Sequence, residues 1–217
     1  MNARDTVLRR IRDALVDVPD SETPDDVPVP RGHRASHAGP DVIGLFTERA
    51  AEYRTTVVRV SANQAAAAVG RALTRSGARE VVVPHGFPHE FLPDGPWARL
   101  DEAQGGPPLT VRRLEAASAV VTTATVAIAV TGTIVLDSGP GQGRRALTLL
   151  PDQHICVLHA TQIAGDVSEA LRRLDPSRPL TMISGPSATS DIELERVEGV
   201  HGPRTLDIIV IEDAPAG

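Results

Sequence analysis

Lysine is absent from the sequence, and all 22 basic residues are arginine. A lysine Schiff base, a lysine general base and the phosphate-binding lysine of a Walker loop are therefore excluded. Cys156 is the only cysteine among 217 residues, so the chain alone cannot supply the thiolates of an iron–sulfur cluster or a Cys-x-x-Cys redox pair. Because Cys156 lies in the run 154–158, which has the pattern of a strand, we expect a buried structural thiol rather than a nucleophile.

Aromatic residues make up only 2% of the chain, so its core must be aliphatic, as in a sheet covered by helices. No apolar run approaches the roughly 20 residues that a membrane span needs, and residues 1–18 are amphipathic rather than a signal peptide. The net charge of -6, without a basic block, argues against nucleic acid and anionic membranes. We therefore expect a cytoplasmic protein with neither kind of partner.

The composition divides the chain into three parts. Residues 1–17 carry apolar side chains at helical spacing and predict an amphipathic helix, which either docks on a partner or another protomer or packs on its own domain. Residues 18–40 contain five prolines among polar residues and predict a flexible linker. Residues 41–217 suit one domain, since single cores grow to about 250 residues before they split.

Strand and helix patterns alternate along this domain. The predicted strands are 56–60, 80–84, 154–159, 180–183 and 206–211, and the predicted helices are 41–54, 61–77, 112–117 and 166–174. The β-rich runs 126–130 and 133–137 are joined only by Thr131 and Gly132, so they must be antiparallel. The pattern predicts a three-layer α/β domain whose mostly parallel sheet carries an antiparallel hairpin insertion.

Two segments rich in glycine and proline separate these elements. Segment 85–108 holds most of the aromatic residues, so we interpret it as a lid-like loop; the prolines beside His85 and His89 argue against a metal site there, and we expect no metal. Segment 138–143 has three glycines and is interpreted as a plain mobile hairpin, with close backbone approach as the alternative. No Gly-x-Gly-x-x-Gly motif opens a helix, so a dinucleotide site is disfavoured.

The hydroxyl-rich turn 184–193 is the main candidate site. It follows the apolar run 180–183, and Ser190 to Glu193 fits a capping box, which predicts a helix beginning at Ser190. Unpaired N–H groups and the hydroxyls of Ser187 and Thr189 would then converge beyond the carboxyl end of a strand, where open α/β sheets place ligands. The alternative is a well-capped helix that binds nothing.

The charges near this turn indicate the class of ligand. Asp191 and Glu193 would oppose a phosphate dianion, so a 2-hydroxy or 2-oxo acid is the better candidate. A carboxylate is best held by the bidentate fork of an arginine, and Arg145 is the first choice, with Arg144 second. The predicted ligand-binding residues are therefore Arg145, Ser187, Thr189, Ser190, Asp191 and Glu193.

Three segments together resemble the lactate utilization protein C family, the bearers of the LUD domain: 131–136, 145–155 and 184–203, the last with a Gly-Pro-Ser turn and a Gly-Val-His-Gly-Pro return. The resemblance covers about 41–213, so 41–217 is interpreted as a LUD-type domain. It implies the fold shared by glucosamine-6-phosphate isomerases, ribose-5-phosphate isomerases and CoA transferases. It also implies oxidation of L-lactate to pyruvate with two iron–sulfur partner proteins. The family usually has acidic residues where this chain has Thr125 and Val130.

The resemblance singles out His201 as well. With an unperturbed pKa near 6.5, its side chain suits removal of a hydroxyl proton from a 2-hydroxy acid; the alternative is a structural turn histidine. A helix beginning at Ser190 would deliver residues 199–203 to the amino ends of the strands, away from the turn. This geometry argues against a catalytic His201.

Three function classes stay open. The first is a subunit of a multi-protein system oxidising L-lactate, which binds no cofactor itself and leaves the clusters to its iron–sulfur partners. The second is a free-standing isomerase or acyl-CoA transferase-like enzyme of the same fold. The third is a non-catalytic scaffold or ligand-binding protein. It is supported by the predicted helix 1–17, which the linker separates from the domain, and by Thr125 and Val130 in place of the usual acidic residues. A homo-oligomer is compatible with each class.

Overall fold

The computed structural model describes residues 2–19, 21–23, 26, 37–103, 105–189, 197–198 and 202–212. The chain divides into two compact units, Met1–Arg34 and Ala35–Gly217. In the first unit, helix α1 (Ala3–Ala14) begins where the Asn2 side chain accepts a hydrogen bond from the Asp5 N–H at 2.8 Å. This cap satisfies one of the N–H groups that a helix start leaves without a partner. No residue of α1 is buried.

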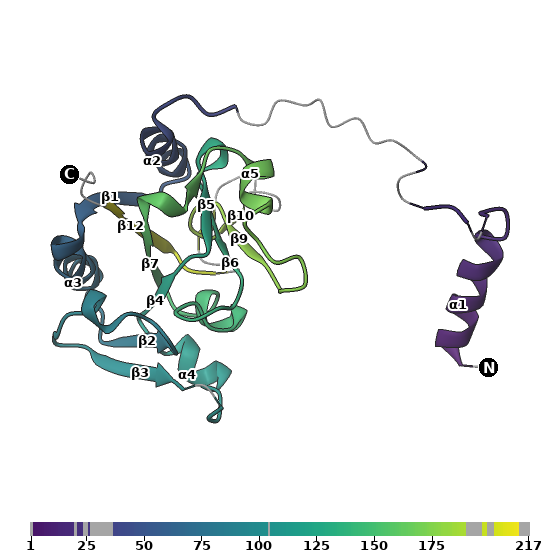
Figure 1. Ribbon diagram of the computed structural model, residues 1–217. Coiled ribbons are helices and arrows are strands. Elements are labelled where there is room, and N and C mark those ends of the chain that lie inside the picture. The colour runs from purple at the N-terminus through teal and green to yellow at the C-terminus, as the bar shows by residue number, and fades with distance from the viewer. Residues whose placement is uncertain are drawn as a thin grey trace. The chain divides into compact units, whose positions relative to one another are not determined.

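A six-stranded sheet in the second unit is parallel throughout. Its order is β1 (Thr56–Ser61), β12 (Thr205–Glu212), β7 (Gln153–His159), β4 (Ala119–Thr123), β2 (Glu80–Pro84) and β3 (Ala98–Glu102). Figure 1 shows these strands beside helices α2 (Val42–Glu52) and α3 (Ala65–Ser76). Parallel strands inside a sheet are covered on both faces, which explains why the inner strands β12, β7, β4 and β2 are mostly buried and largely apolar.

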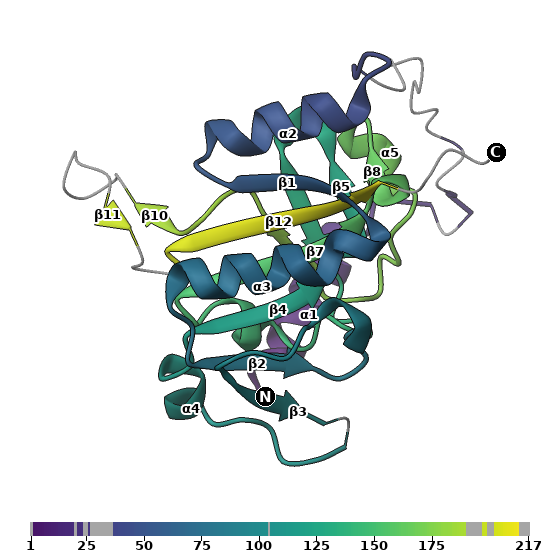
Figure 2. The ribbon, with the colours of Figure 1, turned by 90° about the vertical axis from the view of Figure 1, so that its left-hand side faces the viewer.

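The α3 helix covers one face of this sheet. Its residues Val69 and Leu73 are fully buried against alternate strand residues such as Val121, Ile155 and Ile209. The helix ends at Gly77, whose φ of 67° is the left-handed conformation that glycine adopts most easily. Figure 2 shows α3 lying across the parallel strands on the face toward the viewer. The helix and its end residue are as predicted from the sequence.

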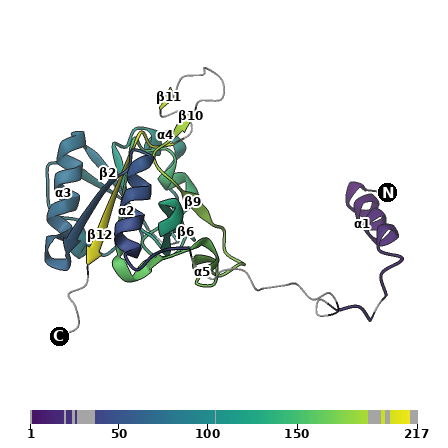
Figure 3. The ribbon, with the colours of Figure 1, turned by 90° about the horizontal axis from the view of Figure 1, so that it is seen from above.

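A second layer covers the other face. Phe46 of α2 packs there against Cys156, Ile208 and side chains of a second sheet, all buried. This four-stranded sheet has the order β8 (Ile163–Ala164), β5 (Val126–Ile128), β6 (Thr133–Leu136) and β9 (Thr181–Ile183), and α5 (Val167–Leu171) packs behind it. Seen from above, α3 and the second sheet lie on opposite sides of the parallel sheet (Figure 3). The α/β class is confirmed.

The predicted hairpin is present, but it belongs to the second sheet. Strands β5 and β6 are antiparallel, with Ala127 opposite Ile134. They join β8 and β9 instead of entering the parallel sheet. Both faces of β5 and β6 are buried, because the parallel sheet covers one and α5 covers the other. A hairpin with two apolar faces cannot lie at an exposed edge, which explains its place between two layers.

The lid-like interpretation of segment 85–108 is wrong. The short helix η2 (His89–Phe91) and the sixth parallel strand, β3, lie within it. Phe87 and Trp97 are 3% and 9% exposed and belong to the cluster under α3. Strand β3 is an edge strand with a polar sequence and an exposed face, so its composition carries little strand signal.

The position of the candidate turn also differs from the prediction. The strand that precedes it, β9, pairs antiparallel with β6 in the second sheet and is half exposed. The predicted helix start at Ser190 lies outside the described residues. On either side, β10 (Ala188–Thr189) and β11 (Val197–Glu198) pair antiparallel, beside the start of β12 (Figure 2). The turn therefore does not continue a strand of the parallel sheet.

The remaining short elements are the helices α4 (Val111–Glu115), η1 (Ala62–Gln64), η3 (Ala129–Thr131), η4 (Arg145–Thr148) and η5 (Ala160–Gln162). Leu114 of α4 and Leu147 of η4 pack with Val82 and Val120 on the same sheet face as α2. Within the described parts of the chain, no helix has the length and apolar character needed to cross a membrane.

Candidate functional site

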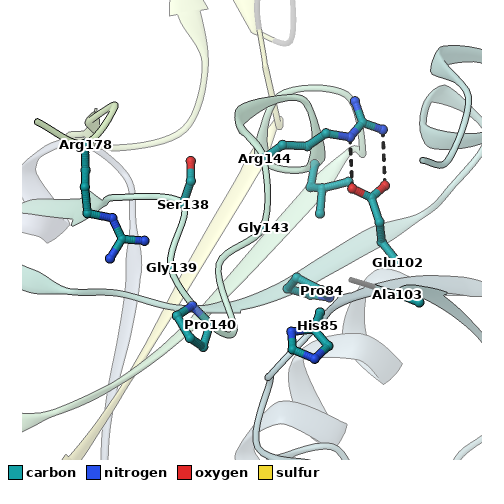
Figure 4. A pocket seen from close by; sticks show the side chains of 11 residues that line it. Pro84, His85, Glu102, Ala103, Ser138, Gly139, Pro140, Gly143, Arg144 and Arg178 are labelled. Atoms are coloured by element: carbon teal, nitrogen blue, oxygen red, sulfur yellow. Dashed lines mark hydrogen bonds and ion pairs between the residues drawn. The ribbon is translucent and has the colours of Figure 1, made fainter. Parts of the chain in front are cut away.

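Among the cavities along the parallel sheet, two at opposite ends of its strands are considered as candidate sites. The first, of about 380 Å³, lies at the carboxyl ends of β2 and β3 and is the region drawn in Figure 4. We call it the carboxyl-end cleft; it is lined by Pro84, His85, Glu102, Ala103, Ser138, Gly139, Pro140, Gly143, Arg144, Leu147 and Arg178. Open α/β sheets most often bind ligands at this end.

The glycine-rich loop 138–143 forms the floor of this cleft. Its backbone is bonded to two strand ends: Gly141 N–H donates to the His85 carbonyl at 2.7 Å, and Thr123 N–H donates to the Gly141 carbonyl at 2.8 Å. Gly141 has a φ of 75°, and a Cβ there would lie 2.7 Å from Thr123 Oγ1. The mobile-hairpin interpretation is therefore wrong and the alternative, close backbone approach, is right, because hydrogen bonds anchor the loop to both strand ends.

The two arginines of the carboxyl-end cleft form ion pairs with neighbouring carboxylates. Arg144 donates to both carboxylate oxygens of Glu102, at 2.9 and 3.2 Å, and to the Leu109 carbonyl at 2.6 Å. Arg178 lies 3.1 Å from the buried carboxylate of Asp137. Figure 4 shows the Arg144 pair at one side of the cleft and Arg178 at the other. Neither arginine offers an uncompensated positive charge to an anion.

The second cavity, of about 270 Å³, lies where β7 and β12 begin, and we call it the amino-end cavity. Its lining comes from four parts of the chain: helix η4, strand β9 with the candidate turn, the residues before β12, and the first residues of β7 and β12. The lining residues are Arg145, Thr148, Leu149, His154, Thr181, Met182, Ile183, Ser184, Gly185, Pro186, Ser187, Gly202, Pro203 and Leu206. Most of the described part of the candidate turn thus faces this cavity.

The candidate turn is fixed by its neighbours. Gly185 has a φ of 97° and passes so close to Tyr53, at the end of α2, that a Cβ would lie 2.7 Å from the Tyr53 Cβ. Ser187 N–H donates to the Pro203 carbonyl at 2.8 Å. The turn and the return segment before β12 are therefore in contact. The expectation that they lie at opposite ends of the strands is wrong, because β9 belongs to the second sheet.

Arg145 is placed by the first turn of η4. Thr148 Oγ1 donates to the Arg145 carbonyl at 3.0 Å, which closes this short helix. The Arg145 side chain is exposed and forms no ion pair with any residue that the structure describes. Unlike Arg144 and Arg178, its hydrogen-bonding fork is therefore not used by any described residue and can serve an anion.

His154 also lines the amino-end cavity, although it is not among the predicted site residues. It is 1% exposed, and its Nε2 lies 2.7 Å from Thr122 Oγ1 of the neighbouring strand β4. Its Nδ1 is buried and has no hydrogen-bond partner among the described residues. The signal that exists is alternation: His154 is a polar residue on a strand face that otherwise carries Cys156 and Leu158.

Burial controls the ionisation of this region. It lowers the pKa of His154 to about 4, so the imidazole is neutral at pH 7. Burial also raises the pKa of Cys156 to about 12, an effect that a hydrogen bond from Thr122 opposes. Cys156 is free and protonated, in agreement with the prediction of a structural thiol.

The structure brings together two of the predicted ligand-binding residues, Arg145 and Ser187, which line the amino-end cavity. Thr189 lies in β10, directly after this lining. The other predicted residues, Ser190, Asp191, Glu193 and His201, lie outside the described residues. The cavity nevertheless lies at the amino ends of the parallel strands and not at the predicted carboxyl ends. Within the described residues, no cluster of three metal-binding side chains is present.

The fold defines a class of protein: an α/β domain whose parallel six-stranded sheet packs on a second, mixed four-stranded sheet, with a polar cavity where the central strands begin. A LUD domain matches residues 109–211. The chain is 43% identical over 197 residues to lactate utilization protein C of Deinococcus radiodurans, which covers 89% of this chain and 87% of that protein. The chain belongs to the lactate utilization protein C family.

Two further comparisons agree. Lactate utilization protein C of Halalkalibacterium halodurans is 29% identical over 192 residues, 82% of each chain. A crystal structure of a DUF162 family protein from Deinococcus radiodurans is 39% identical, with a TM-score of 0.67, and covers 79% of this chain and 96% of that chain. The family that the three sequence segments indicated is thus confirmed.

Proposed function

We propose that this chain works in lactate utilization and binds a small 2-hydroxy or 2-oxo acid, L-lactate or pyruvate, in the amino-end cavity. One observation carries the proposal: Arg145, without an ion pair among the described residues, shares a cavity of about 270 Å³ with the hydroxyl-rich turn. The names of the relatives support the choice of ligand.

Charge and size both favour such a ligand. A monocarboxylate would pair with the fork of Arg145 through two hydrogen bonds, while the turn around Ser187 would close the opposite wall. Drug-sized ligands occupy pockets of about 300 to 1,000 Å³, so a cavity of about 270 Å³ suits a three-carbon acid better than an acyl-CoA. The isomerase and acyl-CoA transferase alternatives are weaker for this reason, and their fold relationship stays a prediction.

The proposed role is that of one subunit in a multi-protein system. Oxidation of L-lactate to pyruvate releases two electrons and two protons, and we propose that the electrons pass to iron–sulfur partner proteins. A chain with a single cysteine cannot provide the four thiolates of a cluster, and Cys156 is buried and protonated. Ligand binding by this chain and electron transfer by its partners would then be separate tasks.

Calorimetric titration of the full chain with L-lactate and pyruvate tests the proposal. Arg145→Gln should lower the binding affinity for both acids by about tenfold or more, because it removes a charge-assisted pair of hydrogen bonds. Arg178→Gln is the matched control, since Arg178 belongs to the carboxyl-end cleft and is already paired with Asp137. If Arg178→Gln abolishes binding and Arg145→Gln does not, the ligand occupies the carboxyl-end cleft and the proposed site is wrong.

A further inference from the structure

His154 presents a hydrogen-bonding group that the fold does not use. Its Nε2 is engaged by Thr122, while its Nδ1 is buried and has no partner within the described parts of the chain. Buried polar atoms in folded proteins nearly always have a partner, and an unpaired one is unfavourable. Because His154 belongs to the wall of the amino-end cavity, a molecule in that cavity is the natural partner for Nδ1.

Thr122 allows this ring to present either a donor or an acceptor. A neutral imidazole carries its proton on one nitrogen only, and a hydroxyl can donate or accept. When Thr122 donates to Nε2, the proton is on Nδ1, which then donates into the cavity. When Nε2–H donates to Thr122, Nδ1 accepts from the cavity. The Thr122 hydroxyl is also within hydrogen-bonding reach of the Cys156 thiol, which is equally free to rotate its proton.

We infer that Nδ1 of His154 is the specificity contact for the oxygen on the second carbon of the bound acid. The inference rests on the proposed function, in which Arg145 holds the carboxylate of the same molecule. The carbonyl oxygen of pyruvate can only accept a hydrogen bond, so it requires the tautomer with a proton on Nδ1. The hydroxyl of L-lactate can donate, so it is also served by the tautomer with a bare Nδ1.

This arrangement would let one cavity receive both members of the 2-hydroxy and 2-oxo acid pair through a change of tautomer at His154. The burial that keeps His154 neutral at pH 7 is part of the device, because an imidazolium has no acceptor to offer. His154 acts here as a positioning and selecting residue, and no proton transfer to the substrate is assigned to it. An ordered water is the competing partner for Nδ1.

The first test compares three acids that share a carboxylate. Propionate lacks the oxygen on the second carbon, so the full chain should bind L-lactate and pyruvate about tenfold more tightly than propionate. His154→Gln, whose amide reaches the position of Nε2 and not that of Nδ1, should reduce this preference to less than about threefold while leaving propionate affinity unchanged. His85→Gln, which changes an exposed histidine in the carboxyl-end cleft, is the matched control and should retain the preference.

The second test observes the tautomer directly. Imidazole ¹⁵N spectra of the pyruvate complex should show His154 protonated at Nδ1, and Thr122→Val, which removes the hydroxyl, should weaken pyruvate binding. Thr123→Val changes the neighbouring residue of β4, which lies outside the amino-end cavity, and should not. Equal binding of all three acids, or a bare Nδ1 with pyruvate bound, would overturn the role of His154 but not the carboxylate site. Failure of every acid to bind would overturn the proposed function and this inference together.

Discussion

Replacement of His154 by glutamine should change how the stability of the protein depends on pH. Burial holds the pKa of His154 at about 4 in the folded state, whereas an unperturbed histidine titrates at 6.5. The neutral ring is therefore favoured by folding, and its contribution is complete above pH 6.5. As the pH falls from 6.5 toward 4, His154 becomes protonated in the unfolded chain but stays largely neutral in the folded one. The contribution of His154 to the free energy of unfolding is lost over this range.

The size of the effect follows from these two values. Between pH 7 and pH 4 the preferential protonation of the unfolded chain at His154 should lower the free energy of unfolding by about 3 kcal/mol. That amount is a large part of the 5 to 15 kcal/mol by which domains are usually stable. In the glutamine variant no proton is taken up at this position, so its stability should fall less steeply over the same range. The variant should be the less stable protein at pH 7, because glutamine does not fill the ring's volume.

Urea unfolding at several pH values between 7 and 4 measures this difference. Other groups also weaken the fold in acid, among them Asp166, whose pKa is lowered chiefly by its hydrogen bond to His37. These effects are common to both proteins and cancel when the two curves are subtracted. His85→Gln, at an exposed position, should follow the wild-type curve. Parallel curves for the wild type and His154→Gln would show that His154 is not held neutral by burial, and the reasoning would fail.

Three further predictions concern other parts of the chain. Gly132→Ala should cost at least about 2 kcal/mol more stability than Gly77→Ala in urea unfolding, because both glycines have positive φ but only at Gly132 would a Cβ lie 2.4 Å from the backbone nitrogen of Ala50; equal losses would contradict this close approach. Deletion of residues 1–17 should leave the thermal midpoint of a monomeric chain within about 2 °C of that of the full chain, because no residue of α1 is buried. A large fall in the midpoint would show that the helix belongs to the core. The isolated chain, after anaerobic reconstitution with iron and sulfide, should show no cluster absorbance and should not reduce a dye with L-lactate; lactate-dependent dye reduction would refute the proposed division of labour.

Local signals in the sequence located most of the regular elements. Helix α2 begins after Asp41, whose carboxylate accepts from Gly44 N–H at 2.8 Å, as expected of an N-cap. The same holds for α5, which follows Asp166. These helix starts depend on neighbouring residues alone, so they can be predicted from a single sequence. Strand β3 was missed because an edge strand needs only one apolar face.

Local sequence does not predict which of the two sheets each strand joins. The run 180–183 has the apolar composition of a strand, but nothing in it distinguishes a parallel neighbour from an antiparallel one. Its pairing with β6 depends on where the hairpin of β5 and β6 lies, which is a property of the whole fold. The error moved the predicted site from the amino ends of the parallel strands to their carboxyl ends.

The residues that line the amino-end cavity are far apart in the sequence, so only the three-dimensional structure shows that they belong to one site. Arg145 and Ser187 were selected for their chemistry, and they share a lining because η4 and the turn both border the first residues of β7 and β12. A third lining residue, His154, is not distinguished by the sequence, because a histidine within a strand has the same sequence pattern whether or not both ring nitrogens have hydrogen-bond partners. Only the register of β4 with β7, which sets Thr122 beside Cys156, shows that one ring nitrogen is engaged and the other is left for an occupant of the cavity. Since the carboxyl-end cleft pairs its arginines internally, the amino-end cavity is where an added anion would find a cation and a polar nitrogen that no described residue pairs.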